Sequence, residues 1–193
     1  MRCFDISPPL GGLSLWAVPV LRDYPIYLHL LSPAELTKLD RMTSEARRRQ
    51  FVTGRAGLRW LLAQQLGTAP ASIDIAYSPT GKPILPQGNY HFNLSHAYEL
   101  VVIALSSLPV GVDVEYGHRP CAIARIGARF FPEQDWTGAD CRQKFWQLWT
   151  TKEAIGKAVG TGLFTPEPQV DYCLHHFHWQ DYWGTVCQLG VGG

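Results

Sequence analysis

Two carboxylates in the segment GVDVE have the spacing of a paired-acid site. Asp113 and Glu115 are two residues apart, so a β-strand would place both side chains on one face while Val112 and Val114 face the core. An ordinary half-buried strand with a polar outer face has the same pattern, and this plain interpretation is the more frequent one for such a motif alone. The functional interpretation therefore depends on what else the chain brings to this strand.

A third carboxylate lies in the segment WTTKEAIGK. Glu153 and Lys157 are four residues apart, so they share one face of a helix. A surface ion pair is the plain alternative, but Trp146, Trp149 and Ile155 indicate a largely buried helix whose polar groups need partners.

Three acids brought close together repel one another unless a divalent cation neutralises them. Oxygen ligands favour Mg²⁺, which keeps several waters and completes its shell with substrate phosphate. Asp113, Glu115 and Glu153 therefore predict a magnesium site, a phosphate-bearing substrate and phosphoryl chemistry.

Basic side chains gather on one predicted helix of an otherwise neutral chain. They are Arg47, Arg48, Arg49, Arg55 and Arg59, and Lys82 follows a glycine in a tight turn. Arginine forks bind phosphate bidentately, so such a cluster can hold a polyphosphate ligand or an acidic protein. A solvated helix face explains Arg47 to Arg49 equally well. Arg55 has glycine neighbours that permit close approach of a ligand or another helix.

The histidines give weaker signals. His96 ends the segment NLSH at the end of a predicted strand, where ligand contacts often lie, although a lone histidine there is more often structural. His175, His176 and His178 have no carboxylate or cysteine partner at metal-site spacing, so we expect them on a partly exposed strand.

Composition limits the class of protein. The 193 residues carry a net charge of +1, with 46% hydrophobic and 17% charged residues, which predicts a folded chain with a sizeable core. No apolar stretch approaches the roughly 20 residues needed to span a bilayer. The first residues contain no continuous apolar run with a cleavage site, so we do not expect export, and the five cysteines form no CxxC pair. We expect a soluble cytoplasmic protein that binds neither membrane nor nucleic acid.

The elements that position these residues can be predicted from hydrophobic periodicity and turn signals. Strands are predicted over 13–20, 25–31 and 73–77, and an antiparallel meander over 90–94, 100–105 and 110–115. A capping box at 32–35 begins a short helix. A long helix begins at 43 or 44 and closes at Gly67.

The second part of the chain is predicted in the same way. A helical stretch follows Pro132, and a helix runs from 140 or 141 to about Val159, with Gly160 and Gly162 as stop signals. The last 30 residues or so give one or two strands. The class is α+β, in two comparable halves over 1–100 and 101–193 that form one compact unit with the active site at their seam.

Five segments together resemble the Sfp-type 4′-phosphopantetheinyl transferases in order and spacing. They are GKP at 81–83, HFNLSH at 91–96, GVDVE at 111–115, FF at 130–131 and WTTKEAIGK at 149–157. The resemblance covers roughly residues 44–163. It implies a monomer with a pseudo-twofold fold, in which each half has a small antiparallel sheet and helices and coenzyme A binds between the halves.

The resemblance also implies roles for individual residues. Asp113, Glu115 and Glu153 resemble magnesium ligands, and Lys157 resembles a pyrophosphate contact and proton donor to the leaving group. Ser95 and His96 would contact phosphate. Gly81, Lys82 and Pro83 would line the adenine and phosphate region, Arg55 with Arg48 would bind the 3′-phosphate, and Lys152 would be a further coenzyme A contact.

The activity implied is Mg²⁺-dependent transfer of the 4′-phosphopantetheine arm of coenzyme A to a serine of an apo acyl or peptidyl carrier protein, with release of 3′,5′-ADP. Catalysis would rest on Asp113, Glu153 and Lys157, with Glu153 as the base directly or through a water. One alternative is a Mg²⁺-dependent nuclease or phosphodiesterase, which the neutral charge disfavours. The other is a non-catalytic module that binds an acidic partner, which leaves the three carboxylates unexplained.

Overall fold

Four antiparallel strands form the first sheet, in the order β1-β2-β6-β5. They are β1 (Phe4–Asp5), β2 (Leu13–Pro19), β5 (His91–Ala97) and β6 (Leu100–Ser106). Strand β6 is buried along its whole length because both of its faces are covered. Val101 and Ile103 pack with the helix α2 (Glu45–Leu66), whereas Val102 and Ala104 pack with the second sheet.

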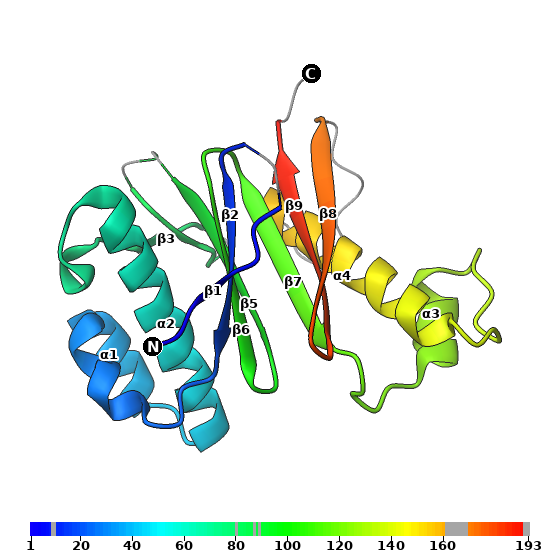
Figure 1. Ribbon diagram of the computed structural model, residues 1–193, viewed down its shortest axis with the longest axis horizontal. Coiled ribbons are helices and arrows are strands. Elements are labelled where there is room, and N and C mark those ends of the chain that lie inside the picture. Colours follow the sequence, from blue (N-terminus) through cyan, green and yellow to red (C-terminus); the bar gives the residue numbers. More distant parts are fainter. Residues whose placement is uncertain (9–10, 80, 87, 89, 161–169, 191–193) are drawn as a thin grey trace.

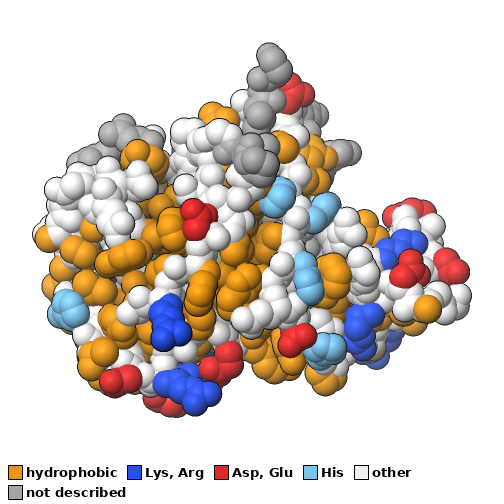
Figure 2. Space-filling view, in the orientation of Figure 1, with side chains coloured by type: hydrophobic (Ala, Val, Ile, Leu, Met, Phe, Trp, Pro, Cys, Tyr) orange, Lys and Arg blue, Asp and Glu red, His pale blue; other side chains and the backbone are white. Residues whose placement is uncertain are grey.

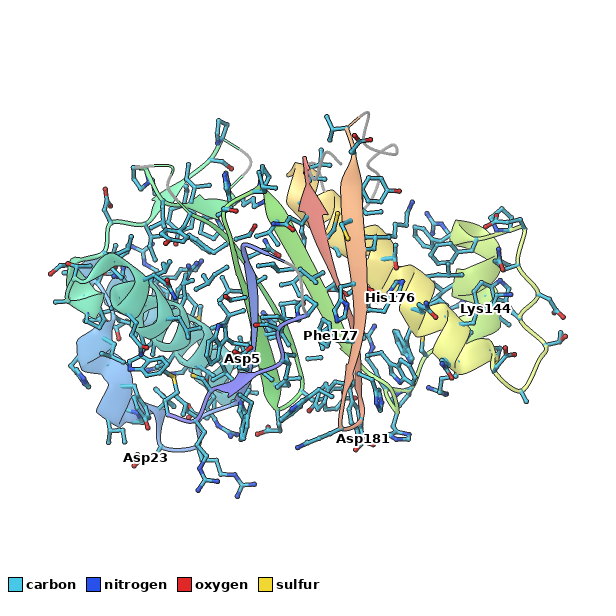
Figure 3. The ribbon with its side chains drawn as sticks, turned by 45° about the horizontal axis from the view of Figure 1, so that its top comes forward. Asp5, Asp23, Lys144, His176, Phe177 and Asp181 are labelled. Carbon is cyan, nitrogen blue, oxygen red and sulfur yellow. The ribbon has the colours of Figure 1, made fainter. Side chains whose placement is uncertain are left out.

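The second sheet has three strands in the order β7-β9-β8. They are β7 (Val110–Tyr116), β8 (Tyr172–Trp179) and β9 (Tyr182–Leu189), and the helix α4 (Cys141–Val159) covers the outer face. The chain therefore builds four layers, helix, sheet, sheet and helix, which Figure 1 shows from left to right. Phe177 of β8 lies between the sheets, against the strands of the first half (Figure 3).

The structure described here is a computed structural model that covers residues 1–8, 11–79, 81–86, 88, 90–160 and 170–190. Within these ranges the expected α+β fold of two halves, each with an antiparallel sheet and helices, is confirmed. None of the helices in these ranges is long and apolar enough to cross a membrane.

The two halves meet where β5 runs beside β7. The amide of Val112 donates to Asn93 Oδ1 at 2.9 Å, and the amide of Val114 donates to Ser95 Oγ at 3.3 Å. Side chains of β5 thus satisfy backbone donors of β7 that a ladder would otherwise pair. The predicted meander is correct for β5 and β6 but wrong for its third strand, because β7 pairs with β9.

Strand β6 belongs wholly to the first sheet. The chain passes to the second sheet between Ser106 and Val110. Strand β6, which begins at Leu100, is an inner strand of the first sheet, between β2 and β5.

The predicted helix signals of the first half are confirmed. Helix α1 (Pro33–Asp40) begins with a capping box, in which Ser32 Oγ accepts from the Glu35 amide at 3.3 Å and Glu35 Oε2 accepts from the Ser32 amide at 3.0 Å. Helix α2 begins after Ser44 and ends at Gly67, whose φ of 64° is the left-handed conformation that glycine adopts most easily.

Three element predictions are wrong. In place of the strand predicted over 25–31 the chain forms the 3-10 helix η1 (Tyr24–Leu30), because proline near its start presets a helical φ and removes a ladder donor. The strand predicted over 73–77 shortens to β3 (Ala76–Tyr77), which follows η2 (Pro70–Ser72) and pairs with β4 (Pro83–Ile84). The short helix α3 (Ile123–Phe130) precedes Pro132 instead of following it.

The C-terminal predictions are confirmed. Helix α4 ends at Gly160, which has a φ of 87°; the second predicted stop, Gly162, lies outside the described residues. Both expected strands are present as β8 and β9, and His175, His176 and His178 lie on β8. Figure 2 shows histidine side chains over these strands.

Candidate active site

Close packing of α4 on β7 brings the two predicted chemical motifs together. A Cβ atom at Gly111 would overlap Ala154 O and Ala158 N of α4, so only glycine lets the helix backbone approach this strand. Residues 111, 113 and 115 alternate onto the side of β7 that faces α4, while Val112 and Val114 pack in the core between the sheets, as predicted.

The centre of the site is a hydrogen-bonded group of three side chains. Asp113 Oδ1 accepts from Lys157 Nζ at 2.7 Å and from Ser95 Oγ at 2.9 Å. Lys157 Nζ also lies 3.2 Å from Ser95 Oγ and donates to Val112 O at 3.2 Å. The group therefore joins β5 of the first half to β7 and α4 of the second.

These side chains line a cavity of about 480 Å³ at the seam. Its lining includes the three predicted acids Asp113, Glu115 and Glu153, together with Lys157, Ser95 and His96. Polar and charged groups from three separate elements, β5, β7 and α4, thus reach one cavity.

Two acids of this cavity, Glu115 and Glu153, have raised pKa values. Burial raises the pKa of Glu115, and the nearby Asp113 adds to the rise, although Arg119 donates to both Glu115 oxygens at 3.2 and 2.9 Å. Burial, and after it Asp113, raises the pKa of Glu153 as well. Burial, and after it repulsion from Asp113, therefore disfavours the charged form of Glu153 at neutral pH.

A divalent cation fits the atoms present. Asp113 is 6% exposed, and its Oδ2 is buried without a hydrogen-bond partner in the described part of the chain. Such an atom needs a donor or a cation. Glu115 and Glu153 supply further oxygen donors in the same cavity. Among the residues that the structure describes, however, no three acidic, histidine or cysteine side chains are already gathered as a metal-binding group.

His96 opens to the same cavity from the end of β5. Desolvation, and after it the Lys157 ammonium, lowers the pKa of His96. The imidazole is therefore neutral at neutral pH, when it can donate one hydrogen bond to an anionic ligand.

A second cavity of about 520 Å³ adjoins the first and shares Gln50, Leu94 and His96 with it. Three cationic side chains, Lys38, Arg47 and Arg55, line this second cavity, which also includes Pro83. The two hollows together offer an acidic end and a basic end along the seam, which suits an elongated anionic ligand bound with a cation.

Three other predicted ligand residues, Arg48, Lys152 and Gly81, lie outside the lining of both cavities. Arg48 donates to Tyr24 Oη at 3.0 Å, Leu39 O at 2.8 Å and Met42 O at 3.3 Å, so it ties the start of α2 to the segment before it. Lys152 lies on α4 next to Glu153 but outside the lining of either cavity. Gly81 lies in the turn between β3 and β4, with a φ of 80°.

Lys82 is also engaged by backbone groups. Its Nζ donates to Lys157 O at 2.6 Å, Val110 O at 3.3 Å and Ala158 O at 3.4 Å. The ammonium caps the C-terminal end of α4, where the helix dipole favours a positive charge. Lys82 thus joins the β3–β4 turn to the helix that carries Lys157.

We expect Lys82→Met to lower the free energy of unfolding by about 1.5–3 kcal/mol, because the charged donor to the buried end of α4 is lost. Urea denaturation measures this change. Lys38→Met is the matched control, since Lys38 is exposed on α1, and it should change stability by less than about 0.5 kcal/mol. Equal stability of the two variants would contradict the capping role.

The raised pKa of Glu153 predicts a pH-dependent stability effect. A carboxylate whose pKa is higher in the folded chain opposes folding above that pKa, and the opposition disappears as the pH falls toward the unfolded value of about 4.3. With a chelator present, we therefore expect Glu153→Gln to melt at a higher temperature than the unsubstituted protein at pH 8, with each 1 kcal/mol giving about 2–4 °C.

This gain should shrink as the pH is lowered through the raised pKa of Glu153, and differential scanning calorimetry at several pH values measures it. Glu133→Gln removes the same charge from an exposed position and should show no such gain. A lower melting temperature for Glu153→Gln at pH 8 would contradict the described repulsion.

Several lining residues escaped the sequence analysis. Gln50, Tyr98 and Arg119 line the first cavity, and Lys38 lines the second. Only Arg119, four residues after Glu115, carries a local signal, since it forms an ion pair with that residue at 2.9 Å. The others reach the seam through the tertiary fold.

Two family models match the chain in succession. The model described as 4′-phosphopantetheinyl transferase, N-terminal, matches residues 14–108, and the model described as 4′-phosphopantetheinyl transferase superfamily matches residues 109–182. Their junction falls between β6 and β7, where the chain passes from the first sheet to the second.

Individual proteins are similar over much of the same length. The 4′-phosphopantetheinyl transferase HetI of Nostoc sp. is 32% identical over 163 residues, which make up 77% of this chain and 69% of HetI. The Synechocystis sp. protein slr0495 is 33% identical over 160 residues, 77% of this chain and 65% of its own. The 4′-phosphopantetheinyl transferase Sfp of Bacillus subtilis is 27% identical over 156 residues, 77% of this chain and 69% of Sfp. The match thus spans about two thirds of each relative.

Proposed function

The chain belongs to the 4′-phosphopantetheinyl transferase superfamily, and from this premise we propose that it transfers the 4′-phosphopantetheine arm of coenzyme A to a serine of an apo acyl or peptidyl carrier protein, releasing 3′,5′-ADP. The observation that carries the proposal is the cavity at the seam, where three acids, Lys157, Ser95 and His96 meet. It combines the groups that a pyrophosphate and a divalent cation would need.

Coenzyme A would lie along the two adjoining cavities. Its pyrophosphate would face Lys157, Ser95 and His96, which are donors at neutral pH. Its 3′-phosphate would lie at the basic end beside Arg55. Pro83 lines that end, in keeping with the expected adenine region, whereas the partners of Arg48 and Lys82 favour structural roles for both.

Mg²⁺ would be held by Asp113, Glu115 and Glu153, and when bound it would neutralise charge on the pyrophosphate oxygens. The unpartnered Oδ2 of Asp113 and the raised pKa values of the two glutamates support this assignment. Asp113 also fixes the position of Lys157, since it is the ion-pair partner of that residue at 2.7 Å.

The reaction forms a bond from the carrier serine oxygen to the β-phosphorus of coenzyme A and breaks the bond to the bridging oxygen of the pyrophosphate. Glu153 accepts the serine proton, and Lys157 donates a proton to the departing 3′,5′-ADP. Alignment of the two reactants supplies much of the acceleration, on the order of 7–11 kcal/mol in favourable cases.

The nuclease alternative needs a broad basic surface. On the face shown in Figure 2, Lys and Arg side chains form small separated groups and no broad basic surface. The non-catalytic alternative would use the arginines of α2, but Arg48, Arg49 and Arg59 are bound to groups within the chain.

We further propose that the protein acts as a monomer in the cytoplasm.

Thermal shift separates these three functions. Coenzyme A with Mg²⁺ at about 100 times its dissociation constant should raise the melting temperature by about 5–10 °C, whereas duplex DNA with Mg²⁺ should not. A shift with DNA alone would favour the nuclease. The absence of a shift with either ligand would favour the binding module.

A further inference from the structure

A buried ion cluster lies behind the basic cavity and joins α1 to α2. Glu35 is 4% exposed, Arg55 9% and Arg59 1%. Glu35 Oε2 accepts from Arg59 Nε at 2.6 Å, and Glu35 Oε1 lies 3.6 Å from Arg55 Nε. One carboxylate faces two guanidinium groups, so the cluster keeps one positive charge in excess.

The two arginines have different surroundings. Arg59 uses its Nη1 to donate to Pro70 O at 2.7 Å and to Ile73 O at 2.9 Å, which makes it a structural residue. Arg55 lines the cavity, and its buried Nη1 has no hydrogen-bond partner in the described part of the chain. A buried charged donor without a partner is costly, so the excess charge resides where an anionic ligand can meet it.

Contacts on several sides hold the Arg55 guanidinium. The Phe51 and Tyr77 rings lie 5.7 and 6.0 Å from it, and Arg55 Nη2 makes a long 3.4 Å contact with Tyr77 Oη. Glu35 approaches the Nε edge by charge instead of a hydrogen bond. Glu35 itself is fixed by the capping box and by Arg59, so its carboxylate has little freedom.

We infer that Glu35 is a positioning residue for the 3′-phosphate of coenzyme A. It holds Arg55 by the Nε edge and so presents the Nη atoms to the phosphate, which replaces the long Tyr77 contact. This inference rests on the proposed function for the identity of the ligand. Glu35 of the capping box at the start of α1 thereby also positions Arg55, the proposed ligand contact on α2.

The test compares the affinities for coenzyme A and for 3′-dephospho-coenzyme A by titration calorimetry. In the unsubstituted protein we expect coenzyme A to bind about 10- to 100-fold more tightly, as for a charge-assisted hydrogen bond. Arg55→Met should remove this preference. Glu35→Gln should reduce it about tenfold while leaving the affinity for the dephospho form unchanged, which a general loss of structure would not do.

The double variant completes the test. If Glu35 acts through Arg55, Glu35→Gln with Arg55→Met should show no less preference than Arg55→Met alone. Asp40→Asn, an exposed acid at the far end of α1, is the matched control. If Glu35→Gln does not fold, Glu35→Asp keeps the charge but retracts it, and should show an intermediate preference.

Three results would overturn the inference: an unsubstituted protein without preference, a Glu35 variant with full preference, or an equal loss of affinity for both ligands. Failure of the proposed function is distinguishable. A protein that prefers coenzyme A but modifies no carrier would refute the transferase and leave the role of Glu35 intact.

Discussion

Asp113→Asn is expected to reduce the rate of carrier modification about 10³-fold. The carboxylate is the ion-pair partner of Lys157 at 2.7 Å, and its other oxygen is the buried, unpartnered atom that the proposed cation would contact. Loss of a catalytic cation removes several kcal/mol of charge stabilisation, and each 1.36 kcal/mol is a factor of ten in rate. Asparagine keeps the size of the side chain, so packing on β7 is preserved.

The measurement is the initial rate of carrier modification, with circular dichroism to verify the fold. Asp181→Asn is the matched control, because Asp181 lies exposed in the turn between β8 and β9 (Figure 3). This control should keep full activity. An Asp113→Asn enzyme with more than about a tenth of the original rate would refute the central role of Asp113.

Glu153→Gln is expected to lower kcat by about 10²- to 10⁴-fold, the range for loss of a general base. Glu153 lines the same cavity as Asp113 and Lys157, where the carrier serine would meet coenzyme A. The same substitution is thus expected to stabilise the free protein and to remove its activity.

Pre-steady-state transfer kinetics at saturating coenzyme A and Mg²⁺ measure this effect, with Glu133→Gln as the control for loss of one exposed charge. If Glu153→Gln turned over normally and bound Mg²⁺ normally, the base would have to be another group. If high Mg²⁺ restored full activity to the variant, Glu153 would be a metal ligand only.

Local patterns predicted the parts of the site that depend on one element. The period of two in GVDVE placed Asp113 and Glu115 on one side of β7, and the spacing of four placed Glu153 and Lys157 on one side of α4. The capping box at Ser32 and Glu35 was predicted for the same reason.

Contacts between distant segments could not be predicted in this way. The contact between β5 and β7 depends on the side chains of Asn93 and Ser95, which in the sequence look like any polar residues of a strand. Lys82 reaches the carbonyl of Lys157 across 75 residues, and Glu35 reaches Arg59 across 24. Such long-range pairs follow no spacing rule. From the sequence, Lys82 was therefore predicted to bind a ligand, and Glu35 was predicted only to begin a helix.

Intact-mass spectrometry of an apo carrier protein tests the central claim most directly. After incubation with this protein, coenzyme A and Mg²⁺, the carrier should gain the mass of one phosphopantetheine arm, and it should gain nothing when Asp113→Ala replaces the unsubstituted protein. Acyl and peptidyl carriers should both be offered. An unchanged mass for every carrier, together with no binding of coenzyme A, would contradict the transferase activity. The three carboxylates would then favour the alternative, a nuclease or phosphodiesterase.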